Sequence, residues 1–207
     1  MERLRGDDGL NALTDGQLVA LCHAGDTEAF GRLAERWETA LFQFVRRTVG
    51  NPDEAKDLCQ DALTKAYQNI GRLRDGDKFK AWLYHIAQNL YRDRFRTLKG
   101  RADVRSLEDV GASELNATGQ QVPLAPDVAA SRANLADLLG SALGTLPIEQ
   151  RTAIVLREYH GFNSEEIGEI TGVPSTTVRT RIFYGLKSLR SSCSERGLTP
   201  DLLEGDL

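Results

Sequence analysis

The chain is poor in the residues that build disulfide frameworks and closed metal sites. Its 207 residues include three cysteines, Cys22, Cys59 and Cys193, and three histidines. An odd number of cysteines without paired spacing argues against a disulfide framework. A closed zinc site usually takes four ligands at set spacings, whereas Cys22–His23 is the only adjacent Cys/His pair. We therefore expect no metal site and no cofactor.

Long apolar runs and catalytic motifs are also missing. No apolar run approaches the roughly 18–20 residues that a membrane span needs. The N-terminal MERLRGDDGLNALTDG has no apolar core of signal-peptide length, so we expect a cytoplasmic protein without membrane insertion. We find no glycine-rich phosphate loop, no His/Glu metal helix and no nucleophile motif. These absences argue against an enzyme.

Positive charge is scarce overall but concentrated in two segments. The formal net charge is −4, which is unusual for a nucleic-acid-binding protein. However, residues 92–101 hold five cations and one acid, and residues 171–192 hold four cations and no acid. Such local patches set the field that a phosphate backbone meets. The acids lie elsewhere, which suggests a second partner that is not DNA.

Helical periodicity dominates the N-terminal half. Three apolar stripes at i, i+3, i+4, i+7 spacing predict helices that begin after Asp26, at Asn51-Pro52 and near Asp77. A short helix capped by Thr14, with Gln17 three residues on, precedes them. The stripes can bury one another as a helical bundle.

Residues 102–128 break this pattern. They hold four Gly and Pro residues, five acids and one cation, the composition of a flexible linker. Helices resume near Ser131. The stretch NSEEIGEITGVPSTTVRTRIFYGLKSLR then reads as a helix-turn-helix, with Ser164 as the cap and Gly172 in the turn. We expect Val178, Ile182, Leu186 and Leu189 to face inward on its second helix.

Three surfaces are candidate binding sites. The second helix of the helix-turn-helix exposes hydroxyls and cations suited to the major groove, although a basic solvated helix is the alternative. The predicted helix from Phe79 carries cations, amides and Tyr84 on what we expect to be its outer face, which suits unpaired bases. The helix DEAKDLCQDALTKAY carries an acidic face, which by itself is usually only solvated.

Three segments in this order resemble extracytoplasmic-function (ECF) sigma factors. They are DEAKDLCQDALTKAY, FKAWLYHIAQNLYRDRFR and LPIEQRTAIVLREYHGFNSEEIGEITGVPSTTVRTRIFYGLKSLR. The resemblance implies a factor that binds core RNA polymerase and promoter DNA, with an anti-sigma factor as a further partner. It implies polymerase binding by Asp57, Leu58, Gln60 and Asp61. The two DNA-binding sets are Ser175, Thr176, Thr177, Arg179, Thr180, Arg181 and Lys187 for the −35 element, and Arg72, Lys78, Lys80, Tyr84, Asn89, Arg92 and Arg96, with the 71–78 loop, for the −10 element.

We therefore predict an all-α protein with two helical domains joined by a flexible acidic linker. The expected parts are an N-terminal extension (1–13), sigma region 2 (14–98), the linker (99–130), sigma region 4 (131–192) and a C-terminal tail (193–207). A free-standing repressor or activator, an enzyme, and an anti-sigma or adaptor protein are the alternatives. Ordinary helix-turn-helix regulators bind duplex half-sites as dimers, whereas a sigma factor alone should bind duplex promoter weakly.

Overall fold

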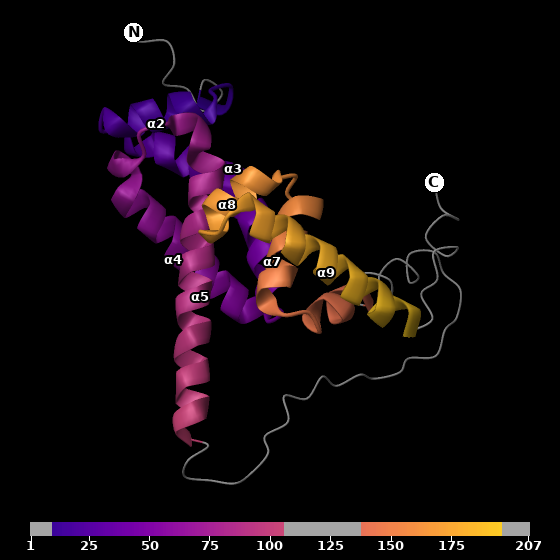
Figure 1. The fold of residues 1–207 in the computed structure, drawn as a ribbon. Helices are drawn as coiled ribbons and strands as arrows, with labels where there is room; N and C mark the ends of the chain where they lie inside the picture. Colours follow the sequence, from indigo (N-terminus) through magenta and orange to yellow (C-terminus); the bar gives the residue numbers. More distant parts are fainter. Residues whose placement is uncertain (1–9, 106–137, 196–207) are drawn as a thin grey trace, which may run out of the picture.

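The computed structural model describes residues 10–105 and 138–195, and within these ranges the regular structure is entirely helical. The predicted all-α class with two helical domains is confirmed. The first domain (residues 10–105) contains α2 (Asp15–His23), α3 (Thr27–Val49), α4 (Pro52–Asn69), η1 (Ile70–Arg72), η2 (Gly76–Lys78) and α5 (Phe79–Arg105). The second domain (residues 138–195) contains helical residues 138–144, then α7 (Ile148–Glu158), α8 (Ser164–Thr171) and α9 (Ser175–Glu195) (Figure 1).

Local capping explains where the first helices begin. Thr14 and Gln17 form a capping box at α2, and Asp26 accepts hydrogen bonds from the first turn of α3. Asn51 caps α4, where Pro52 occupies the first turn. These starts agree with the predicted ones. α5 begins at Phe79 rather than at Asp77, because a separate 3-10 turn precedes it.

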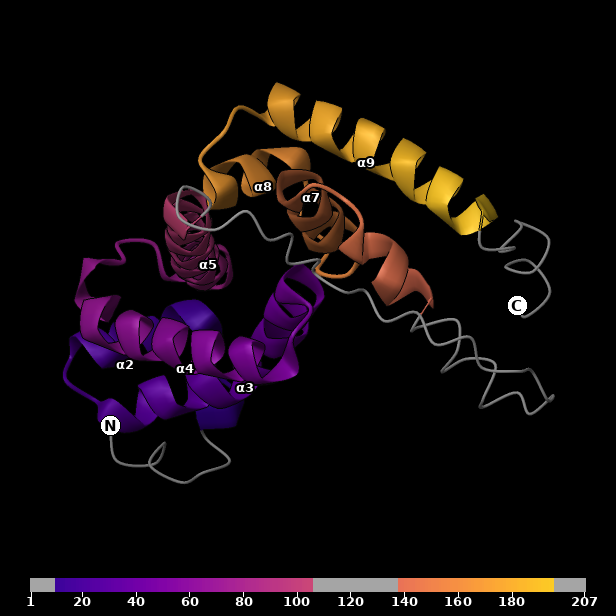
Figure 2. The same cartoon turned by 90° about the horizontal axis from the view of Figure 1, so that it is seen from below.

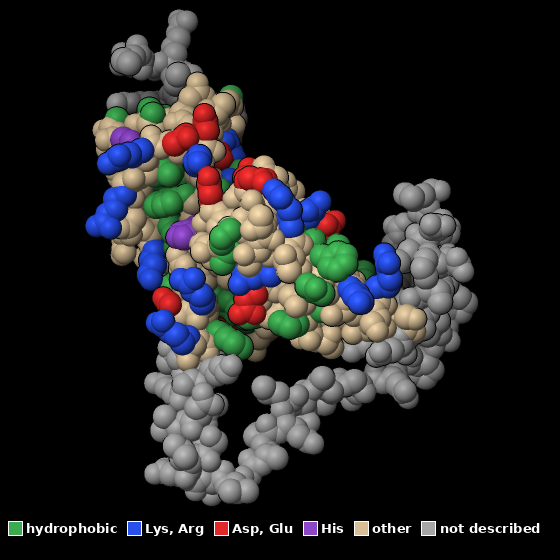
Figure 3. Space-filling model, in the orientation of Figure 1, with side chains coloured by type: hydrophobic (Ala, Val, Ile, Leu, Met, Phe, Trp, Pro, Cys, Tyr) green, Lys and Arg blue, Asp and Glu red, His purple; other side chains and the backbone are tan. Residues whose placement is uncertain are grey.

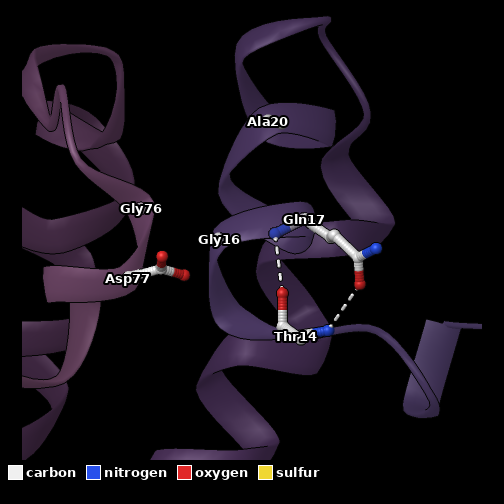
Figure 4. A pocket seen from close by; sticks show the side chains of 6 residues that line it. All are labelled: Thr14, Gly16, Gln17, Ala20, Gly76 and Asp77. Carbon is white, nitrogen blue, oxygen red and sulfur yellow. Dashed lines mark hydrogen bonds between the residues drawn. The ribbon is translucent and has the colours of Figure 1, made fainter.

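The 71–78 loop packs closely against the rest of the first domain. η1 and η2 bracket Leu73, which is buried. Gly76 packs against α2 so closely that a Cβ atom on it would lie 2.7 Å from Cα of Gly16. Figure 4 shows this junction, where Gly76 and Asp77 face Gly16 beside the Thr14–Gln17 capping box. Gly76 therefore permits a close approach between the backbones of the loop and α2.

The second domain has the predicted helix-turn-helix with two local differences. Asn163, not Ser164, is the cap of α8, and its capping-box partner is Glu166. Gly172 ends α8 at φ 73°, as the left-handed turn requires. In the turn of α9 after Ile182, the buried residue is Gly185, where a Cβ atom would lie 2.7 Å from Cδ1 of Ile154. The neighbouring Leu186 is 41% exposed. The prediction that Leu186 faces inward is wrong.

The segment between the domains lies partly in α5. This helix runs to Arg105 and so covers the first residues of the predicted linker, 99–105. The remainder of the linker, the predicted helix start near Ser131, and most of the two terminal segments lie outside the described residues.

The two domains pack directly against each other. α8 lies against α5, and α7 lies against α3, in both views of the fold (Figures 1 and 2). Buried apolar residues of both domains form one continuous cluster, which joins Phe44 and Tyr84 to Phe162 and Ile170. α9 lies on the outside, on the far side of α7 and α8 from the first domain (Figure 2). The contact therefore covers part of α5 and leaves the outward face of α9 open.

Candidate nucleic-acid interface

α9 presents the predicted −35 residues on its outer side. Val178 and Ile182 are buried and fix the rotation of the helix. Among the seven predicted residues, Thr176, Arg179, Thr180 and Lys187 are exposed, and Ser175, Thr177 and Arg181 are half-buried. Figure 3 shows Lys and Arg side chains along α9 with an apolar patch between them. This arrangement matches what a helix needs to enter the major groove.

Arg179 is paired within its own domain. Its Nη2 donates a hydrogen bond of 2.7 Å to Oε1 of Glu165 on α8. Backbone hydrogen bonding at Glu165, followed by this bond from Arg179, holds the pKa of the Glu165 carboxyl below its ordinary value. Both side chains are exposed, at 58% and 64%, so the pair is screened by water and can exchange for a DNA contact.

Two aromatic residues of α9 were missed by the sequence reasoning. Phe183 and Tyr184 are 65% and 53% exposed and stack edge-to-face with 5.3 Å between ring centroids. They lie between Thr180 and Lys187 on the helix, outside the buried positions 178, 182 and 185. The signal was available, because an inner stripe at 178 and 182 puts 183 and 184 away from it. Apolar groups on a groove-binding helix can contact thymine methyl groups.

The predicted −10 residues fall into two groups. Four of them are exposed: Arg72 and Lys78 in the loop, and Arg92 and Arg96 on α5. In contrast, Lys80 and Tyr84 contact His160 of the second domain, and the half-buried Asn89 is bonded to His85 on α5. Tyr84 is fully buried, so the prediction that it faces outward is wrong. Burial against the Phe162 ring, 5.1 Å away, raises the pKa of the Tyr84 hydroxyl far above its ordinary value.

A chain of hydrogen bonds links α5 to α8. Nη2 of Arg92 donates to Oδ1 of Asn89 at 3.0 Å, and Nδ2 of Asn89 donates to Nε2 of His85 at 2.8 Å. Nδ1 of His85 then lies 3.0 Å from the carbonyl oxygen of Ile170. The neutral tautomer with its proton on Nδ1 satisfies both ends of the ring. The predicted −10 residues Asn89 and Arg92 are thus connected to the helix-turn-helix through His85.

His160 lies at the centre of the contact between the domains. Its Nδ1 is 2.9 Å from the Tyr84 hydroxyl, and its carbonyl accepts a 2.8 Å hydrogen bond from Nζ of Lys80. Phe44 packs edge-to-face on the ring, with 5.8 Å between centroids. Burial, with further contributions from Arg47 and Lys80, lowers the pKa of His160 from 6.5 to about 4. The ring is therefore neutral at neutral pH, and both cations that disfavour its charge belong to the first domain.

The predicted polymerase-binding residues on α4 include three exposed residues and one buried residue. Asp57, Gln60 and Asp61 are exposed, as an acidic docking face requires. Leu58 is buried together with Ala55 and Ala62 in the core of the first domain. The assignment of the Leu58 side chain to the docking surface is therefore corrected: it holds α4 in place instead.

Neither a metal cluster nor a membrane helix is found in the part of the chain that the structure describes. No group of three or more His, Cys, Asp or Glu side chains there could hold a metal ion. No described helix is long and apolar enough to cross a membrane.

Two helical domains, one with an outward basic helix-turn-helix and one with a basic helix beside an acidic one, define a nucleic-acid-binding protein of the helix-turn-helix class. Residues 33–101 match the family Sigma-70 region 2, and residues 136–189 match Sigma-70 region 4.

Relatives with curated names extend these matches over most of the chain. It is 35% identical over 171 residues to the ECF RNA polymerase sigma factor SigW of Bacillus subtilis, with 80% of this chain and 89% of that protein covered. It is 31% identical over 178 residues to the ECF RNA polymerase sigma-E factor of Escherichia coli K12, with 86% and 93% covered. The chain belongs to the ECF family of RNA polymerase sigma factors, which are transcription initiation factors and not enzymes.

Solved structures share the fold. The chain is similar to CnrH in a complex with the cytosolic domain of CnrY, at 26% identity and a TM-score of 0.61, with 93% of this chain and 99% of that one covered. It is also similar to the sigma factor RpoE in complex with the anti-sigma factor NepR from Bartonella quintana, at 25% identity and a TM-score of 0.63, with 81% and 98% covered.

Proposed function

We propose that this sigma factor binds core RNA polymerase through the exposed acidic face of α4 and reads the −35 element with α9. The 71–78 loop and the side of α5 that carries Lys80, Asn89 and Arg92 then engage the unpaired −10 element. The observation that carries the proposal is the orientation of α9, whose hydroxyls and cations face outward while Val178 and Ile182 anchor it. The chain has no catalysis of its own in this proposal. Its proposed parts are sigma region 2 (14–98), the linker (99–130) and sigma region 4 (131–192).

The polymerase-binding part rests on Asp57, Gln60 and Asp61. They are exposed on one side of α4, whereas Ala55, Leu58 and Ala62 bury the other side. Charge reversal by Asp61→Arg should weaken binding to core polymerase without disturbing the fold. Glu35→Arg on α3 is the matched control, because Glu35 is an exposed acid with only a surface pair to Arg32.

Run-off transcription with core polymerase on a set of candidate promoters tests the function as a whole. We expect transcription only when the factor is added, with a defect for Asp61→Arg and none for Glu35→Arg. Equal activity of Asp57, Gln60 and Asp61 triple substitutions would remove the docking assignment. Tight binding of the chain alone to duplex half-sites as a dimer would favour a free-standing regulator instead.

Promoter opening needs a separate assay. Asn89→Ala should fail on duplex promoter and recover on a template already mismatched across the −10 region, because flipping a base costs a few kcal/mol that the premelted template no longer requires. Equal defects on both templates would remove the case for melting. No defect on either would refute the assignment of this face.

An anti-sigma factor is the further partner that we propose. The similar RpoE chain was solved with the anti-sigma factor NepR, which supports a protein partner of this kind. Co-purification of the chain with a candidate anti-sigma protein, followed by loss of run-off transcription, tests it.

A further inference from the structure

We infer that Glu165 is a positioning residue for the reading of the −35 element, because it holds Arg179 toward base edges and away from the phosphate backbone. The inference rests on the proposed role of α9 in binding the −35 element. It adds a residue of α8 that does not belong to the predicted DNA-binding set. Glu165 acts through Arg179 and does not itself contact a base.

The two side chains meet across the helix-turn-helix. Nη2 of Arg179 on α9 donates a 2.7 Å hydrogen bond to Oε1 of Glu165 in the first turn of α8. Both residues line one hollow of the surface, beside Asn163 and Ser164. Backbone hydrogen bonding, then the bond from Arg179 and, more weakly, one from the Ser175 side chain hold the pKa of the Glu165 carboxyl below its ordinary value. The carboxylate is therefore charged at neutral pH.

The packing of α8 fixes where Glu165 stands. The side chain of Asn163 accepts hydrogen bonds from the backbone N–H groups of Glu165 and Glu166, at 2.9 Å each, and so caps the helix. Gly168 lies so close to the turn that a Cβ atom on it would be 2.8 Å from the carbonyl oxygen of Val173. α8 therefore has little room to shift against the beginning of α9, and Glu165 presents its carboxylate from a rigid element.

The ion pair affects base contacts and phosphate contacts differently. A guanidinium carries five N–H donors in a planar fork, and the bond to Glu165 uses one of them. Two of the others can engage O6 and N7 of guanine while that bond is kept. A phosphate contact instead exchanges the carboxylate for a phosphate, and it leaves a second negative charge beside the DNA backbone. Glu165 therefore favours the base contact of Arg179 over a phosphate contact.

Base preference is measured with holoenzyme assembled from core polymerase and the full chain. The probe is a candidate promoter randomised over its −35 element and sequenced before and after selection by binding. Arg179→Ala identifies the base pair that Arg179 reads. Glu165→Ala should lower the preference for guanine at that base pair by about two- to fivefold, which corresponds to the strength of an exposed ion pair. Glu165→Gln keeps an acceptor oxygen and should lose less.

Salt dependence distinguishes positioning from a general loss of structure. If Arg179 turns to a phosphate in Glu165→Ala, one more counterion is released, and the slope of log K against log salt concentration becomes steeper by about 0.9. The matched control is Glu158→Ala, because Glu158 is an exposed glutamate of the same domain that lies 3.6 Å from Arg157 of its own helix. This control should leave both the base preference and the slope unchanged. Thermal unfolding followed by circular dichroism shows that each variant keeps its helices.

A double substitution decides whether the carboxylate acts through Arg179 or contacts DNA itself, since a carboxylate can also accept a hydrogen bond from N4 of cytosine. In the Arg179→Ala background, Glu165→Ala should have no further effect on base preference, because no guanidinium is left to position. A loss of preference that persists in this background means that Glu165 contacts DNA and overturns the inference.

The remaining outcomes separate the inference from the proposed function. A −35 preference that Arg179→Ala abolishes at one base pair but that both Glu165 variants leave intact overturns the inference alone. A library from which the unaltered chain selects no −35 sequence overturns the proposed function of α9 and the inference with it. Lower guanine preference and a steeper salt slope in Glu165→Ala, both absent from Glu158→Ala, support the positioning role.

Discussion

The contact between Gly76 and Gly16 leaves no room for a side chain at position 76. In Gly76→Ala the new Cβ would lie 2.7 Å from Cα of Gly16 and 3.1 Å from its carbonyl oxygen, so backbone has to move. Overpacking of this kind costs about 1–3 kcal/mol. In a chain of this length, 1 kcal/mol lowers Tm by about 2–4 °C, which gives a decrease of about 2–12 °C.

Two neighbouring glycines provide graded controls. In Gly16→Ala the Cβ would meet Oδ1 of Asp77 at 2.5 Å, but this atom ends a flexible side chain and can swing away. Gly71 has no atom within 4 Å of its Cβ position, so Gly71→Ala should be neutral or stabilise by about 0.4–1 kcal/mol through the unfolded state. We therefore expect the highest Tm for Gly71→Ala, a lower Tm for Gly16→Ala and the lowest Tm for Gly76→Ala.

Tryptophan fluorescence during thermal unfolding is the suitable assay. Both tryptophans of the chain, Trp37 and Trp82, lie in the first domain, so the signal reports that domain alone. Gly76→Ala should also weaken engagement of the −10 element, because the loop that carries Lys78 must shift away from α2. If Gly76→Ala melts at the temperature of Gly71→Ala, the close backbone approach does not hold the loop and the reasoning is refuted.

Three further predictions concern the two domains. Leu58→Ala should lower the free energy of unfolding by about 2–5 kcal/mol because Leu58 is buried, whereas Asp61→Ala should reduce polymerase binding with little effect in urea denaturation; the reverse pattern would contradict the division of α4. Arg179→Ala should relax preference at one or two −35 positions by about 1–3 kcal/mol in competition binding with base substitutions, whereas a uniform loss would make it a phosphate contact. The pKa of His160 is about 4 in the folded chain and 6.5 in the unfolded chain, so the unfolded chain binds more protons between these two pH values. The contribution of His160 to the free energy of unfolding is therefore fully present above pH 6.5 and is lost as the pH decreases toward 4. After solvent screening this loss is on the order of 2 kcal/mol. Urea midpoints at pH 7 and pH 4.5 should differ less for His160→Gln than for the unaltered chain. The same difference in both proteins would contradict the role of His160 in this pH dependence.

The predictable part of the fold consists of features that the chain encodes locally. Helix starts at Thr14, Asp26 and Asn51 follow from side chains that bond to the next turn, and Gly172 follows from the left-handed turn. The exposed residues of α9 follow from the helical period once Val178 and Ile182 are assigned to the core. Such signals need no knowledge of distant segments.

The predictions of side-chain orientation are wrong where contacts with distant segments determine which residues are buried. Tyr84 packs on Phe44 of its own domain, and Phe162 and His160 of the second domain complete its burial. Gly185 replaces Leu186 as the inner residue because α7 approaches too closely for a side chain, which no period in α9 shows. Leu58 is different, because its place in the apolar stripe of α4 already indicates burial, whereas the family resemblance assigns it to the docking surface.

The direct packing of α8 on α5 has a consequence for how the molecule responds to concentration. Both surfaces belong to one polypeptide, so their association is unimolecular and dilution leaves its equilibrium unchanged. Occupancy by DNA, polymerase or any other separate molecule falls as the partners become dilute, whereas a tethered surface keeps an effective concentration set by its linker. The docked arrangement is therefore the state to which each released molecule returns, however few copies are present.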